Sequence, residues 1–113
     1  MKINEAIETL KHRKSTSEKY MLDFVKEIQR NPFRAMETSD RAIQESARID
    51  IFSGVIISLD SHDSVDYMIG FCHKEALRMA RFPQKSTSVT SNLMHQYQAA
   101  AFIEVAEILQ GFK

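Results

Sequence analysis

The stretch that decides the fold is LMHQYQAAAFIEVAEIL, residues 93–109, in which Glu104 and Glu107 are the only charged residues. Upstream of it, the sequence has no Asp, Glu, Lys or Arg between Lys85 and Glu104. The stretch has the residues of a helix throughout and is apolar on nearly every side, and a helix of that kind is usually buried. We therefore predict a helix at residues 89–110 around which the rest of the chain packs.

Three further helices are predicted upstream, at about residues 4–30, 39–60 and 64–82. In the first, apolar residues recur at the i, i+3, i+4 and i+7 positions of one helix face, and Asn31-Pro32 ends the helix. These apolar residues are Met21, Phe24, Val25 and Ile28. The polar residues near Ser15 leave open whether this is one helix or two, and the apolar rhythm favours one. Phe33, in the loop that follows, is expected to pack under the other helices.

The second predicted helix has a competing interpretation as a buried strand. Residues 49–59, IDIFSGVIISL, are rich in β-branched residues and contain Gly54, which suits a strand. No other stretch has a convincing strand pattern with which it would pair, and sheets need partners. Apolar residues also recur at four-residue steps from Ile43 to Leu59, and this spacing favours a helix.

Four helices with short connections predict an all-α fold, an antiparallel four-helix bundle-like single domain spanning residues 1–113. A chain of this length buries roughly two thirds of its unfolded surface. The last helix offers more apolar surface than a lone bundle covers, so we expect a homodimer or higher homo-oligomer formed through it. The expected interface residues are Leu93, Met94, Tyr97, Ala100, Ala101, Phe102 and Val105.

The cysteine content and the N-terminus indicate a compartment. Cys72 is the only cysteine, so no disulfide forms within the chain, and the N-terminal residues lack the apolar run of a secretory signal. No run of about eighteen apolar residues is present to span a membrane. We therefore expect a cytoplasmic protein that does not insert into a membrane.

A ridge of basic residues is predicted on the third helix and its exit, at the i, i+4, i+7 and i+11 positions. Its members are Lys74, Arg78, Arg81 and Lys85. They suit contact with a phosphate backbone, although cations near a helix C-terminus are also favoured by the helix dipole. Fifteen basic and fifteen acidic residues cancel over the chain, and aromatic residues are not interleaved with the ridge. Nucleic-acid contact is therefore an alternative to protein binding.

Two groups of residues have the chemistry of a catalytic or metal site. Asp60, His62, Asp63 and Asp66 lie close together and suit a divalent metal, but acidic residues at a helix start are also favoured by the helix dipole. Cys72 and His73 are adjacent, so on a helix their side chains point about 100° apart and cannot pair. No GxSxG, Walker, GxGxxG, CxxC, HExxH or EF-hand motif is present. We expect no catalytic residues, no bound metal and no cofactor.

These observations predict a non-enzymatic, small helical interaction protein, an adaptor, accessory subunit or regulator that acts by protein–protein contact. Its partner is expected to be a second copy, another protein, or both. The first alternative is a nucleic-acid-binding accessory protein that uses the basic ridge. The last alternative is a metal-dependent helical-bundle enzyme built on the acidic cluster.

Overall fold

The structure is a computed structural model that describes residues 2–61, 64–81 and 89–113. It contains four helices, α1 (Lys2–Arg30), α2 (Ala35–Asp60), α3 (Val65–Arg81) and α4 (Val89–Gln110), and a 3₁₀ turn η1 (Pro32–Arg34) between the first two. The described part of the chain holds no strand, so the predicted all-α class is confirmed. Residues 49–59 lie within α2, which settles the choice between helix and strand there.

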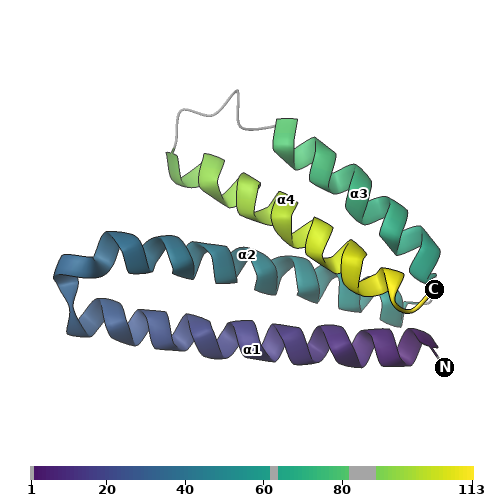
Figure 1. The fold of residues 1–113 in the computed structure, drawn as a ribbon, viewed down its shortest axis with the longest axis horizontal. Helices are drawn as coiled ribbons and strands as arrows, with labels where there is room; N and C mark the ends of the chain where they lie inside the picture. Colours follow the sequence, from purple (N-terminus) through teal and green to yellow (C-terminus); the bar gives the residue numbers. More distant parts are fainter. Residues whose placement is uncertain (1, 62–63, 82–88) are drawn as a thin grey trace.

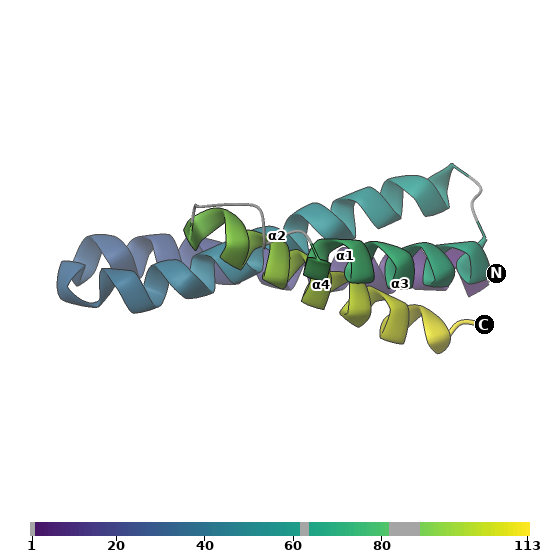
Figure 2. The same cartoon turned by 90° about the horizontal axis from the view of Figure 1, so that it is seen from above.

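The helices pair as two hairpins. α1 packs along α2 and α3 packs along α4, and the hairpins meet mainly where α4 lies on α2. Figure 1 shows α4 between α3 and the α1–α2 pair, and Figure 2 shows the same hairpins from above. α1 makes few contacts with α4 and α3 makes few with α2. The compact packing of a four-helix bundle is therefore not confirmed by this arrangement.

The hydrophobic core lies at one end of the molecule, which we call the base. It takes residues from the start of α1, the second half of α2, α3 and the second half of α4. The side chains with the least exposure there include Leu10, Phe52, Leu59, Met68 and Leu109. The chain termini also lie at the base (Figure 1), where Lys2 Nζ donates a hydrogen bond to the Lys113 carbonyl at 2.8 Å.

The apolar character of α4 is explained within the chain itself. α3 packs along one side of this helix and α2 along another, so residues on several of its faces are buried. Ala101, Val105 and Leu109 are each at most 1% exposed, and Phe102 is 7% exposed. The apolar surface of α4 that the sequence predicted to be free for oligomerisation is therefore largely covered by α2 and α3.

The turn between α1 and α2 is shorter than the sequence suggests. α1 is one continuous helix, and α2 begins at Ala35, four residues before the predicted start at 39. Phe33 was expected to be buried, and that prediction is wrong because its side chain is 100% exposed. η1 lies beyond the ends of both helices (Figure 1), where no other described element covers it.

Two polar links fix where α4 lies along α2. Arg48 of α2 donates from Nε to Glu104 Oε2 at 3.0 Å and from Nη1 to Glu45 Oε1 at 2.8 Å. Tyr97 of α4 donates its hydroxyl to Asp40 Oδ1 at 2.5 Å. This hydrogen bond, then burial and the negative charge of Asp40, raise the pKa of Tyr97 above its usual value.

Candidate functional site

The linked ends of α1 and α2 form a projecting part of the molecule, which we call the hairpin tip (residues 20–43). Figures 1 and 2 both show these ends extending past the start of α4. Large apolar side chains are exposed there: Tyr20 by 48%, Leu22 by 62%, Val25 by 42%, Phe33 by 100% and Met36 by 91%. Large exposed apolar side chains gathered at one end of a molecule make that end a candidate interaction surface.

The seam between α1 and α2 changes character along its length. From residue 11 to residue 46, the buried side chains are Ser17, Thr38, Ala42 and Glu45, which are small or polar. The apolar stripe that predicted the first helix lies in this half, where Met21, Phe24 and Ile28 are only partly buried. The tip therefore carries the amphipathic pattern of a core helix without the cover that a core supplies.

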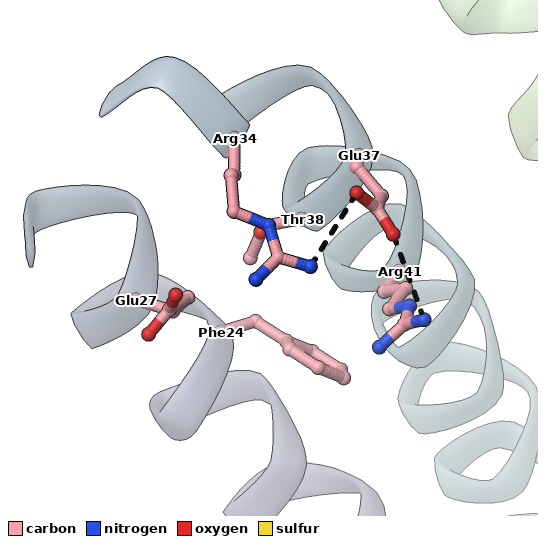
Figure 3. A pocket seen from close by; sticks show the side chains of 6 residues that line it. All are labelled: Phe24, Glu27, Arg34, Glu37, Thr38 and Arg41. Atoms are coloured by element: carbon pink, nitrogen blue, oxygen red, sulfur yellow. Dashed lines mark ion pairs between the residues drawn. The ribbon is translucent and has the colours of Figure 1, made fainter. Parts of the chain in front are cut away.

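A cavity opens at the far end of the tip, shown in Figure 3. It measures about 170 Å³ and is lined by Phe24, Glu27, Arg34, Glu37, Thr38 and Arg41. Glu37 lies between the two arginines, with its carboxylate oxygens 3.7 Å from Arg34 Nη2 and 3.9 Å from Arg41 Nη2 (Figure 3). All three side chains are about 60% exposed, so these ion pairs are weak. The lining holds two cations and two anions, and its formal charge is zero.

A second, apolar groove runs along the tip where α4 begins to cover it. It measures about 280 Å³ and is lined by Met21, Ile28, Ser39, Ala42, Ile43, Ser46 and Met94. The cavity lining holds the Thr38 hydroxyl and two carboxylates, and the groove lining holds two serine hydroxyls and no ionisable side chain. The tip therefore offers apolar contact area and exposed ion pairs, and both are features of protein interaction surfaces.

The predicted interface on the last helix divides into two groups. Ala101, Phe102 and Val105 are buried by the chain's own helices, so they are unavailable to a partner while the chain is folded. Leu93, Met94 and Tyr97 are partly buried and Ala100 is exposed. Met94 lines the apolar groove, so one predicted residue adjoins the tip.

The apolar stripes of the predicted helices did not point to the tip, because its most exposed residues lie at or next to the turn between α1 and α2. Phe33 lies in η1 and Met36 in the first turn of α2, and the sequence placed Phe33 in a loop. Two large apolar side chains this close to the turn between two helices are a usable signal, because turns usually carry small or polar residues. Leu22 lies off the apolar stripe of α1, and its 62% exposure follows from that position.

The predicted basic ridge is described only in part. Lys74 and Arg78 are exposed on α3, Arg81 is the last residue of that helix, and Lys85 lies outside the described residues. Arg78 donates from Nε to Glu75 Oε2 at 2.7 Å. Tyr67 and Phe71 precede Lys74 on the same helix face, and sequence analysis did not connect these aromatic rings with the ridge.

The acidic cluster that was weighed as an alternative metal site is described only in part. Asp60 ends α2 and Asp66 lies in the first turn of α3, both exposed, while His62 and Asp63 lie outside the described residues. No group of three or more His, Cys, Asp or Glu residues within 2–61, 64–81 and 89–113 has metal-binding geometry. Asp66 Oδ1 lies 3.8 Å from Lys113 Nζ.

Cys72 does not have the environment of a nucleophile. Its side chain is 0% exposed, and burial raises the pKa of the thiol to about 11. The thiolate is the reactive form, so a thiol with this pKa is unreactive at neutral pH. His73 lies next to it on α3 but is exposed on a different face.

The remaining findings concern the whole chain. Among the residues that the structure describes, none of the helices has both the length and the apolar character to cross a membrane. Comparison with protein families, with curated proteins and with solved structures found no match to this chain. Its function is therefore argued from its own surfaces.

Proposed function

We propose that this protein is a non-enzymatic helical interaction protein, an adaptor, accessory subunit or regulator, that self-associates through the hairpin tip. The observation that carries the proposal is the exposure of Phe33 and Met36, at 100% and 91%, beside an apolar stripe that is only partly buried. Removing apolar surface from water contributes about 25 cal/mol per Å². Burying these side chains against a partner therefore stabilises the complex relative to the free monomer.

A second copy supplies cover of the right shape. The tip is a single layer of two antiparallel helices, and a helix layer becomes stable when a second layer buries its apolar face. Two tips packed face to face around a two-fold axis form a four-helix bundle between chains. The sequence predicts a four-helix bundle and a homo-oligomer formed through the last helix. In the dimer proposed here, the bundle forms between two chains, and the interface is the tip instead of α4.

The charges at the tip support this choice of partner. Arg34 and Arg41 stand beside Glu27 and Glu37 around one cavity, so the surface carries equal numbers of both signs. In a two-fold interface each patch meets itself, and such a patch matches cations of one copy to anions of the other. A strongly acidic or basic tip would repel its own copy.

The experiment is the solution mass by light scattering over a range of concentrations. We expect the wild-type chain to dimerise, and the double variant Phe33→Ser/Met36→Ser to remain monomeric with an unchanged circular dichroism spectrum. The matched control is Ile57→Ser/Leu77→Ser, which removes two side chains that are 66% and 55% exposed at other places and should still dimerise.

Two outcomes overturn the proposal. A wild-type chain that stays monomeric at every concentration contradicts self-association and assigns the tip to a different protein. A dimer that the control disrupts and the tip variant does not places the interface elsewhere on the molecule.

A further inference from the structure

We propose that the outer face of α3 binds single-stranded nucleic acid, with Tyr67 and Phe71 as a stacking platform and Lys74 and Arg78 as phosphate contacts. These four residues stand at the i, i+4, i+7 and i+11 positions of one helix, so they form a single stripe. All four are exposed. The stripe places two aromatic rings directly before two cations.

The two rings are held in a fixed arrangement. Tyr67 and Phe71 are stacked, with ring centroids 6.4 Å apart and planes inclined by 20°. Phe71 also packs edge-on against Phe102 of α4, at 6.2 Å and 78°, which anchors it to the core. Tyr67 remains 59% exposed. A partly anchored ring with an exposed face is what a nucleobase stacks on.

A hollow beside these rings gives a base somewhere to lie. It measures about 360 Å³ and is lined by Asp66, Tyr67, Gly70, Phe71 and Lys74. A Cβ added at Gly70 would meet no atom within 4 Å, so the absence of a side chain there leaves the floor open. Both rings and the Lys74 side chain belong to the lining of this hollow.

The charges along the stripe favour a phosphate. Arg78 Nη2 lies 2.7 Å from Glu75 Oε2, and the Glu75 side chain is only 16% exposed, so this carboxylate holds the guanidinium in place. The acid in the hollow, Asp66, lies 3.8 Å from Lys113 Nζ and is largely exposed to solvent, so its repulsion of a phosphate is weakened by solvent screening. Lys74 also lines the hollow. We expect it to contact the phosphate of a nucleotide whose base stacks on the rings.

A single strand suits this face better than a duplex. Stacking on an aromatic ring needs a base whose face is free, and bases in a duplex are already stacked on each other. The formal charge of the whole chain is zero, so there is little general attraction to nucleic acid. Binding should therefore depend on the stripe and weaken as salt rises.

The experiment measures fluorescence anisotropy of a labelled oligothymidylate with the full chain at low salt. We expect Tyr67→Ala and Lys74→Glu each to weaken binding by roughly tenfold, from lost stacking and reversed charge. The matched controls are Lys19→Glu on α1 and Ile57→Ala on α2, two exposed residues outside both the stripe and the hairpin tip, and they should leave the affinity unchanged. Duplex DNA of the same length should compete poorly.

Several results would overturn the proposal. Absence of binding at low salt removes the site, and equal losses in the control variants show that attraction is not local to α3. Competition by heparin together with indifference to Tyr67→Ala would indicate a general polyanion contact, without base stacking. None of these results bears on the tip, because α3 and the hairpin tip lie at different places on the molecule (Figure 1).

Discussion

The base and the tip of the α1–α2 hairpin use the same helical periodicity with opposite outcomes. At the base, Ile7 and Leu10 of α1 are 6% and 0% exposed because α2, α3 and α4 contribute to one core around them. At the tip, Val25 on the apolar stripe of the same helix is 42% exposed, and Met21 and Phe24 on that stripe are only partly buried. An apolar pattern therefore shows which face of a helix can be buried. The position of α4 determines which part of the α1–α2 hairpin is buried within this chain.

The largest expected effect separates two leucines of the same helix. Leu10→Ala should lower the free energy of unfolding by about 3 kcal/mol, because it opens a cavity in the base core. The matched change Leu22→Ala should alter it by less than about 0.5 kcal/mol, because that side chain is largely in water. Urea unfolding followed by circular dichroism, at a concentration low enough to exclude self-association, measures both. Similar losses for the two variants would refute the division into base and tip.

The next effect tests the link that fixes α4 on α2. Arg48→Met should cost about 2 kcal/mol, because Glu45, whose side chain is 8% exposed, then keeps its charge without the cation. The double variant Arg48→Met/Glu45→Met should lose less than the single variant, since the buried charge is gone as well. Thermal or urea unfolding of the three proteins provides the comparison. A double variant less stable than Arg48→Met would show that Glu45 contributes in another way.

A smaller effect depends on pH and comes from the second link. Tyr97→Phe should cost about 1 kcal/mol at neutral pH, through loss of the hydrogen bond to Asp40. Because the pKa of Tyr97 is raised in the folded chain, its contribution is fully present below the unfolded pKa of about 10 and is lost as pH rises through the folded value. The wild type and Tyr97→Phe should therefore converge in stability above pH 10. A constant difference across that range would contradict this account.

The smallest effect concerns the residue that is most exposed. Phe33→Ser should change the free energy of unfolding of the monomer by no more than about 0.5 kcal/mol, because the ring is already in water. The measurement is again urea unfolding at low concentration. A large loss would mean that Phe33 packs against other residues in the monomer, which would contradict its place in the exposed surface of the tip.

Much of the fold follows from the sequence. Apolar spacing predicted four helices, and Asn31-Pro32 ended the first of them where the structure does. The choice of helix over strand at residues 49–59 was also right, because a lone strand has no partner. These features depend on neighbours along the chain, which a sequence displays directly.

The placement of the candidate site did not follow from the sequence. Ala101, Phe102 and Val105 were expected at an interface because α4 is apolar all round, yet α2 and α3 cover them. The offset of α4 along α2 is set by contacts such as Arg48 with Glu104, which are 56 residues apart. No local pattern encodes that offset, so the length of hairpin left uncovered does not follow from the sequence, and Phe33 and Met36 near the turn are the local signal that marks its end.

The pairing of helices also has a consequence for how the chain folds. Each hairpin joins helices that are neighbours in sequence, so little loop-closure entropy opposes its formation, and domains dominated by such contacts fold within microseconds to milliseconds. The contacts that join the hairpins link positions 56 and 57 residues apart. We expect both hairpins to form early and to dock late, so that the polar links between α2 and α4 control the last and slowest step of folding.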